Sequence, residues 1–206
     1  MFLEDKKLFE KLIKKYGKVN IINEVKQNKL DKYITNRYPD DPVKSSLYDY
    51  VAGYTLQVND ELRKKRRWDN VTKHLDSAFT NKGIIDVYRT VDWEYMKNIY
   101  GITIDNIKDK IGTILHNRAY MSTTKLFQSP WGSSWTDGEL ILHITSKKEY
   151  PYIDVNNTLD VNDIDCASQE EYLLPRNTKL KIVSYKLLKG RQYHKKGTYL
   201  IELEVV

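Results

Sequence analysis

The spacing of apolar residues changes near residue 81, and this change constrains the fold more than any other feature of the chain. Before that point, apolar side chains recur every three or four positions, which places them on one face of an α-helix. From Gly138 onward, the chain consists mainly of short β-branched and aromatic runs, which predict strands. Helices followed by strands are typical of an α+β fold with an antiparallel or mixed sheet.

Helical spacing in the first part of the chain predicts helices at residues 2–17, 21–30, 42–62 and 74–79. The turn-forming residues 81–83 then lead into a predicted strand over residues 84–89, which ends on Arg89. Residues 102–115 return to helical spacing, and residues 119–124 predict a strand that ends on three hydroxyl side chains. Five further strands are predicted at residues 139–145, 150–155, 172–174, 180–188 and 199–205.

The composition permits one large domain with a substantial core, because 40% of the 206 residues are hydrophobic. No repeat or low-complexity linker divides the sequence, so we expect a single domain over residues 1–206. Its helical part covers about 1–80 and its strand-rich part about 81–206. The apolar runs are far shorter than the ~18 residues of a membrane-spanning helix. No apolar segment of a secretory signal is visible at the N-terminus.

A single cysteine, Cys166, excludes an internal disulfide, and the four histidines show no ligand spacing with it, so no metal site is expected. The net charge of +6 and the run of five basic residues at 63–67 favour acidic partners, nucleic acid among them. However, the tyrosines are not interleaved with this run and no nucleic-acid-binding module pattern is present. The run is more typical of a solvated helix end.

The segment at residues 168–177 places an amide and a carboxylate two positions apart at the start of an apolar strand. Side chains alternate along a strand, so Gln169 and Glu171 are expected on one face and Glu170 on the other. A carboxylate can accept a hydrogen bond from a ribose hydroxyl and stabilise a developing positive charge, while an amide can both donate and accept. An acidic strand start is also common on solvated faces, so this pair alone does not define a site.

Polar side chains also follow two other predicted strands. Arg89 comes directly after Tyr88, and Ser122, Thr123 and Thr124 close the strand at residues 119–124. Taken singly, each group is typical of a surface residue or a turn. Their joint presence, in this order along the chain, favours a functional site.

This order resembles the mono-ADP-ribosyltransferases of the arginine, Ser-Thr-Ser, glutamate type, most closely the bacterial single-domain exoenzymes that modify Rho GTPases. Residues 169–176 look like the Gln-x-Glu-x-Leu-Leu-Pro-Arg signature of that family. Weaker similarity covers the Asn-x-x-Leu-Arg pattern at residues 59–63 and the helix at 75–79, so the resemblance spans roughly residues 47–186. It implies N-terminal helices packed on a mixed, mainly antiparallel β-sandwich core, with NAD as substrate and no metal.

The resemblance also implies roles for individual residues. Glu171 would hydrogen-bond the nicotinamide ribose and stabilise the positive charge that develops as nicotinamide departs. Gln169 would orient the acceptor side chain, and the family associates this glutamine with asparagine acceptors. Ser122 would hold Glu171 in place. The remaining NAD-binding residues would be Arg89 at the pyrophosphate, with Arg63, Asn59, Thr90, Thr123 and Thr124.

Three positions depart from the pattern of the Rho-modifying enzymes. Cys166 stands where those enzymes have an aromatic residue that helps to dock the GTPase, and Thr90 stands in place of a glycine. The loop at residues 127–135 lacks the arginine of the family's phosphate-and-nicotinamide loop, which leaves Trp131 or Trp135 as a stacking surface. The first departure bears on the identity of the target, the second on the approach of nicotinamide to the backbone, and the third on the charges available to the pyrophosphate.

The resulting hypothesis is a mono-ADP-ribosyltransferase that moves ADP-ribose from NAD to a protein side chain, an asparagine of a Rho-type GTPase. Such an enzyme would be a monomeric, secreted bacterial toxin that acts in the host cytosol, with neither a membrane nor a nucleic acid as partner. Two alternatives stay open: an NAD glycohydrolase without a protein target, and a basic nucleic-acid-binding module.

Overall fold

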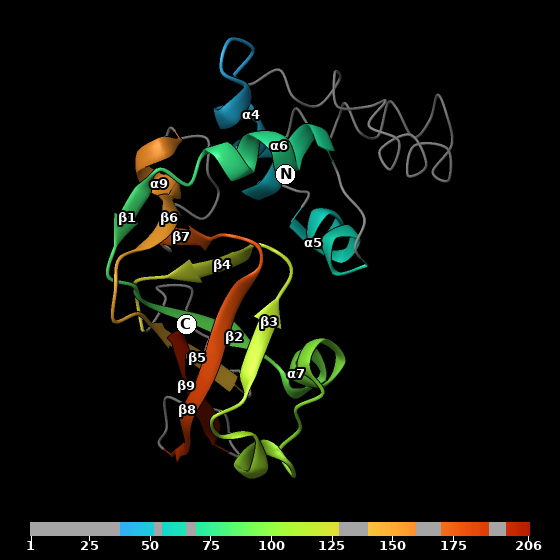
Figure 1. Ribbon diagram of the computed structural model, residues 1–206, viewed down its shortest axis with the longest axis vertical. Coiled ribbons are helices and arrows are strands. Elements are labelled where there is room, and N and C mark those ends of the chain that lie inside the picture. Colours follow the sequence, from blue (N-terminus) through green and yellow to red (C-terminus); the bar gives the residue numbers. More distant parts are fainter. Residues whose placement is uncertain (1–37, 52–54, 65–68, 128–139, 160–169, 190–196) are drawn as a thin grey trace. The chain divides into compact units, whose positions relative to one another are not determined.

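The computed structural model describes residues 38–51, 55–64, 69–127, 140–159, 170–189 and 197–206 (Figure 1). The chain divides into two compact units, which are described separately below. The first contains Met1–Ala78 and Asn157–Asp165, and the second contains Phe79–Asn156 and Cys166–Val206, so the division falls within the short helix α9 (Val155–Thr158). The helices predicted at residues 2–17 and 21–30 lie outside the described residues.

The described part of the first unit is helical, with α4 (Pro42–Asp49), α5 (Thr55–Arg63) and α6 (Asp69–Ser77). The Asp41 side chain caps α4 by accepting hydrogen bonds from the backbone N–H groups of Val43 and Lys44, at 3.1 and 2.9 Å. Helices α4 and α6 pack against each other. The prediction of helical structure at 42–62 is confirmed for the described residues, and the helix predicted at 74–79 begins earlier, at Asp69.

The second unit is built on one nine-stranded sheet with the order β1-β6-β7-β4-β2-β5-β9-β8-β3 (Figure 1). All of its strand pairings are antiparallel except that between β5 and β9. The strands are β1 (Asn81–Gly83), β2 (Asp86–Val91), β3 (Ile114–Asn117), β4 (Met121–Thr124), β5 (Leu140–Thr145), β6 (Tyr150–Asp154), β7 (Glu171–Leu174), β8 (Thr178–Leu188) and β9 (Thr198–Val205). The predicted α+β fold with a mixed, mainly antiparallel sheet is confirmed.

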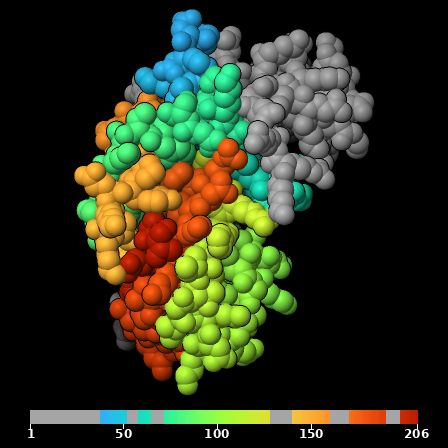
Figure 2. Space-filling view, viewed as in Figure 1, coloured from blue at the N-terminus to red at the C-terminus, as the bar shows by residue number. Residues whose placement is uncertain are grey.

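The sheet is nearly interrupted between β2 and β4. These two strands share one residue pair, Tyr88 with Thr124, whereas β2 and β5 pair over the whole length of β2. The sheet therefore has a four-stranded part, β1-β6-β7-β4, and a five-stranded part, β2-β5-β9-β8-β3. In the space-filling view, β8 lies beside the surface segment that contains β3 (Figure 2).

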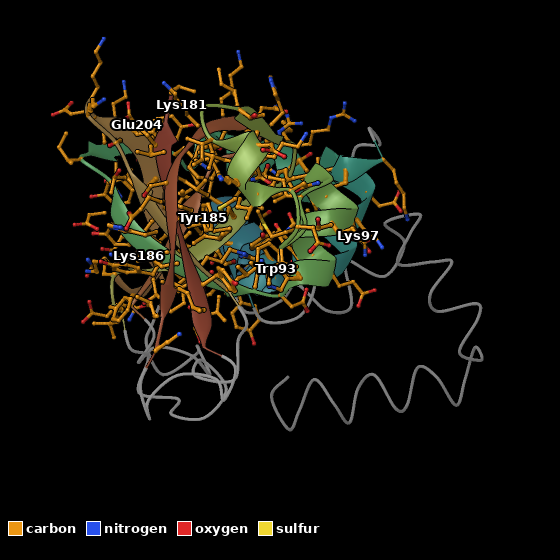
Figure 3. All side chains as sticks on the ribbon, turned by 90° about the horizontal axis from the view of Figure 1, so that it is seen from below. Trp93, Lys97, Lys181, Tyr185, Lys186 and Glu204 are labelled. Atoms are coloured by element: carbon orange, nitrogen blue, oxygen red, sulfur yellow. The ribbon has the colours of Figure 1, made fainter. Side chains whose placement is uncertain are left out.

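The core of the second unit lies on one face of the five-stranded part. Its buried side chains come mainly from β2, β5, β8 and β9, and α7 (Trp93–Tyr100) adds Met96, which is fully buried. Trp93 of α7 makes an edge-to-face contact with Tyr199, which in turn stacks on Tyr185 of β8, so α7 is tied to the rim of this core (Figure 3). Within the described residues, no helix has the length and apolar character needed to cross a bilayer.

Three local predictions were wrong. Residues 81–83 form strand β1 rather than a turn, because they pair with β6. The strand predicted at 84–89 begins at Asp86 and continues to Val91, so Arg89 lies inside β2 rather than at its end. The helix predicted at 102–115 is replaced by a short 3₁₀ helix, η2 (Ile107–Lys110), and by β3.

The isoleucine spacing at 102–115 was misleading because these side chains do not share a buried face. Ile107 is buried, but Ile104 and Ile111 are 47% and 50% exposed. Gly112, inside this range, has a φ of 85°, which a helix cannot accommodate, and Gly101, with a φ of 68°, ends α7 directly before the range. Helix α7 was not predicted, although its capping residues, Asp92 and Gly101, are visible in the sequence.

Candidate active site

The carboxylate of Glu171 lies at the junction of the two parts of the sheet. Glu171 is the first residue of β7, pairs with Thr124 of β4, and is 9% exposed. Because side chains alternate along a strand, Glu171, Thr124 and Ser122 share one face, with Ser122 the diagonal neighbour of Glu171. The Ser122 hydroxyl donates a hydrogen bond to the Glu171 carboxylate. This hydrogen bond is the contact that is expected if Ser122 holds Glu171 in place.

Arg89 joins this group from β2, the strand next to β4. Its Nη1 donates a hydrogen bond of 2.6 Å to the backbone carbonyl of Ser122, and its guanidinium carbon lies 5.6 Å from the centroid of the Tyr95 ring. The Nε of Arg89 is buried and has no hydrogen-bond partner among the described residues. A buried arginine donor of this kind is suited to a phosphate oxygen of a bound ligand.

The electrostatics of Glu171 follow from this arrangement. Burial raises the pKa of the Glu171 carboxyl above its ordinary value, while the hydrogen bond from Ser122 and the positive charge of Arg89 lower it by smaller amounts. The net effect is a raised pKa. A carboxylate shielded from water interacts more strongly with a nearby positive charge, so this site suits the stabilisation of positive charge on a substrate.

Strand β7 begins at Glu171. Glu170, directly before β7, has a φ of 46°, in the left-handed region. The Glu170 carboxylate lies 3.4 Å from Nζ of Lys125 at the surface. Some predicted features fall outside the described residues, namely Gln169, Cys166 and residues 128–135 of the loop with the two tryptophans.

The threonines of β4 lie on opposite faces. Thr124 shares the face of Glu171, and its hydroxyl accepts a 3.0 Å hydrogen bond from the backbone N–H of Leu126. Thr123 points to the other face, where its hydroxyl donates a 2.6 Å hydrogen bond to the carbonyl of Tyr172. Thr123 is therefore not beside the Glu171 carboxylate, although it joins β4 to β7.

Thr90, predicted to contact NAD, lies on the face of β2 opposite to Arg89. Its hydroxyl is buried and has no hydrogen-bond partner among the described residues. The structure does not bring Thr90 next to Arg89 on one face, since consecutive strand residues point in opposite directions.

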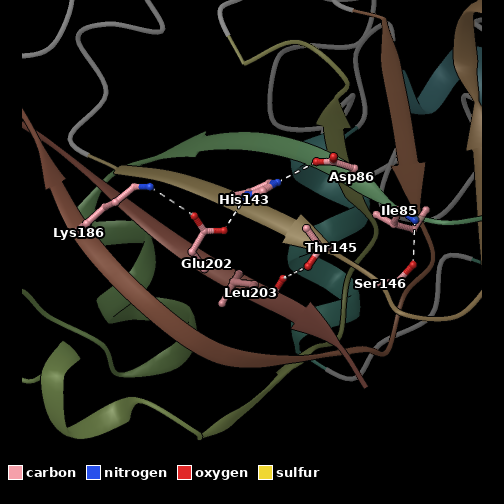
Figure 4. A network of polar contacts seen from close by, with 8 residues as sticks. All are labelled: Ile85, Asp86, His143, Thr145, Ser146, Lys186, Glu202 and Leu203. Atoms are coloured by element: carbon pink, nitrogen blue, oxygen red, sulfur yellow. Dashed lines mark hydrogen bonds and ion pairs between the residues drawn. The ribbon is translucent and has the colours of Figure 1, made fainter.

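A polar cluster that the sequence did not reveal lies on the same face as Thr90. The ring of His143 on β5 lies between two carboxylates, 2.8 Å from Asp86 and 2.5 Å from Glu202, and Lys186 approaches Glu202 at 4.0 Å (Figure 4). Tyr88 stacks on His143, and burial and the two carboxylates raise the pKa of Tyr88. No group of described histidine, cysteine and acidic side chains is arranged to hold a metal ion.

Asn59 and Arg63 belong to the first unit. They lie one turn apart on α5, where residues four positions apart share a face. Asn59 is 3% exposed and donates a 2.8 Å hydrogen bond to the hydroxyl of Tyr50, and Nη1 of Arg63 lies 3.2 Å from Asp60. The structure thus groups Arg89, Ser122, Thr124 and Glu171, and it places Asn59 and Arg63 together on a helix of the other unit.

Similar folds are found among bacterial ADP-ribosyltransferase toxins. Plx2a, an ADP-ribosyltransferase toxin from Paenibacillus larvae, has a TM-score of 0.64 and 20% identity, with 89% of this chain and 96% of that chain covered. The Clostridium limosum C3 exoenzyme gives 0.62 and 16%, with coverage of 81% and 86%. C3stau2 from S. aureus, solved with NAD, gives 0.62 and 17%, with coverage of 85% and 94%. The fold is therefore that of an ADP-ribosyltransferase toxin.

The family model described as ADP-ribosyltransferase exoenzyme matches residues 10–205. The chain therefore belongs to the ADP-ribosyltransferase exoenzyme family. Its sequence has no significant match among the curated proteins. The predictions of an NAD-dependent mono-ADP-ribosyltransferase and of NAD as its substrate are confirmed at the level of the family.

The raised pKa of Glu171 predicts a pH-dependent effect of Glu171→Gln on stability. A carboxyl with a raised folded-state pKa favours folding most below its unfolded-state value and loses that contribution as the pH rises through the folded-state value. We therefore expect the difference in melting temperature, Glu171→Gln minus wild type, to be larger at about pH 8 than at about pH 4. Thermal unfolding at both pH values, with Glu170→Gln as the exposed control, measures this. A constant or decreasing difference contradicts the raised pKa.

Proposed function

We propose that this enzyme transfers ADP-ribose from NAD to a side chain of a host protein, with Glu171 as its catalytic carboxylate. The observation that carries this proposal is the buried Glu171 carboxylate, which accepts a hydrogen bond from Ser122 and lies in the field of Arg89. These three residues come from adjacent strands, and they are the ones that the resemblance assigns to the arginine, serine and glutamate of the motif pattern.

The reaction needs an ionised carboxylate and does not need a general acid. The bond between the ribose and nicotinamide breaks with its electron pair moving to the cationic ring, so nicotinamide leaves as a neutral molecule without protonation. Positive charge then grows on the ribose, where Glu171 would stabilise it. A nitrogen of the acceptor side chain forms the new bond and loses a proton. With water as the acceptor the same chemistry gives NAD hydrolysis.

The other predicted NAD-binding residues lie on different elements of the structure. Arg89 would bind the pyrophosphate, consistent with its buried Nε. The resemblance also assigns NAD binding to Asn59 and Arg63 on α5, to Thr124 on the face of Glu171, and to Thr90, whose side chain lies on the face of β2 opposite to Arg89. Thr123 would shape β4 through its bond to the Tyr172 carbonyl rather than by touching NAD.

The proposed acceptor is an asparagine of a Rho-type GTPase. The support is the glutamine at position 169 and the likeness of residues 169–176 to the signature of the Rho-modifying exoenzymes. Cys166, in place of an aromatic docking residue, would alter the contact with that target. We further propose that residues 1–206 act as one monomeric domain, secreted by a bacterium and active in the host cytosol.

Replacing Glu171 should abolish most of the transfer. A positioned electrostatic group is commonly worth ~3–4 kcal/mol in the transition state, so Glu171→Gln should lower labelling by on the order of 10²–10³-fold. The test incubates the protein with labelled NAD and a host lysate. Glu170→Gln, which removes the neighbouring exposed carboxylate, should label like wild type.

The three functions give different products in this assay. Label on one host protein supports the proposed transferase, and free ADP-ribose alone indicates an NAD glycohydrolase. No consumption of NAD, with salt-sensitive binding to DNA or RNA, indicates a nucleic-acid-binding module. Near-normal labelling by Glu171→Gln contradicts the assignment of Glu171.

The chemistry of the labelled product tests the acceptor. Linkages of ADP-ribose to arginine and to asparagine differ in their lability to neutral hydroxylamine, the arginine linkage being the labile one. We expect the label to persist after this treatment, because Gln169 implies an asparagine acceptor. Loss of the label during the treatment would exclude an asparagine acceptor and would contradict the role given to Gln169.

A further inference from the structure

The guanidinium of Arg89 is held from two sides. On one side its Nη1 donates to the carbonyl of Ser122, and on the other it lies over the ring of Tyr95 on α7, 5.6 Å from the centroid. A distance below about 6 Å is within the range of a cation–π interaction. Because a free arginine side chain samples many rotamers, these two contacts restrict Arg89 to one orientation.

The ring of Tyr95 has its own supports. The carboxylate of Asp92 caps α7 and accepts a 2.6 Å hydrogen bond from the backbone N–H of Tyr95. On the next turn of the helix, the ring of Tyr100 packs edge-to-face on that of Tyr95, with centroids 6.2 Å apart. Tyr95 is thus fixed both through its backbone and through its ring, only a few residues after Arg89.

These supports continue to the strand that carries Ser122. The hydroxyl of Tyr100 donates a 3.2 Å hydrogen bond to Asn117, the last residue of β3. Asn117 is 1% exposed, and its amide donates a 2.6 Å hydrogen bond to the carbonyl of Ala119, just before β4 begins. The aromatic pair on α7 therefore connects the Arg89 side chain with the backbone that leads to Ser122.

We propose that Tyr95 is a positioning residue for NAD binding. It acts through Arg89, holding the guanidinium against the Ser122 carbonyl so that the remaining N–H groups, including the buried Nε, face the pyrophosphate. This inference rests on the proposed function. It adds a requirement for an aromatic ring at position 95, whereas the Tyr95 hydroxyl is not part of it.

The experiment compares Tyr95→Leu with Tyr95→Phe in NAD hydrolysis, which needs no protein target. Tyr95→Leu should raise KM for NAD by about 3- to 30-fold and leave kcat within about two-fold, because a cation–π contact of typical strength orients Arg89 for binding. Tyr95→Phe keeps the ring and should stay within about two-fold of wild type. Tyr185→Leu removes another half-buried aromatic residue that packs on the same core and should leave KM unchanged.

A double-mutant cycle tests whether Tyr95 acts through Arg89. In an Arg89→Met background, adding Tyr95→Leu should change KM no further. A normal KM for Tyr95→Leu, equal damage by Tyr95→Phe, or additive effects in the cycle would overturn the inference alone. A wild-type protein that neither binds nor consumes NAD would overturn the proposed function and this inference with it.

Discussion

The burial of one carboxylate organises the proposed site. Glu171 is the first residue of β7, close to the point where the sheet is nearly interrupted. Burial removes water from its carboxylate, which costs free energy in the ionised form and therefore raises the pKa of the group. The hydrogen bond from Ser122 and the charge of Arg89 offset part of that cost. Both partners come from other strands, so the stabilisation of the ionised carboxylate depends on the pairing of β7 with β4 and of β4 with β2.

The near-interruption between β2 and β4 explains how these side chains meet. A continuous flat sheet would keep Arg89 on the core face of its own strands, next to Val87 and Val91. With a single residue pair joining the two parts, the side chain of Arg89 reaches the carbonyl of Ser122. The fold thereby places a basic and an acidic group close together at this junction. A pyrophosphate requires the basic group, and a cationic glycosidic bond requires the acidic one.

The sequence predicted the fold class because hydrophobic spacing reports burial directly, and it predicted Arg89, Ser122 and Glu171 because their order follows the motif order of a known family. It failed at residues 102–115, where isoleucine spacing mimicked a helix that is interrupted by Gly112, a glycine with positive φ. Neither Tyr95 nor the His143 cluster could be predicted, since both depend on distances between separate elements. The roles of all the predicted site residues, Gln169 and Cys166 included, stay predictions.

We propose that a buried, ionised Glu171 stabilises the positive charge that develops on the ribose. The pH dependence of kcat/KM for NAD hydrolysis tests this claim most directly, because it reports the essential groups of the free enzyme. We predict an acid limb with a midpoint above the ordinary pKa of glutamate. The midpoint should be higher still in Ser122→Ala, which loses a hydrogen bond that lowers the pKa of Glu171. An acid limb at the ordinary value, unmoved by Ser122→Ala, would contradict it.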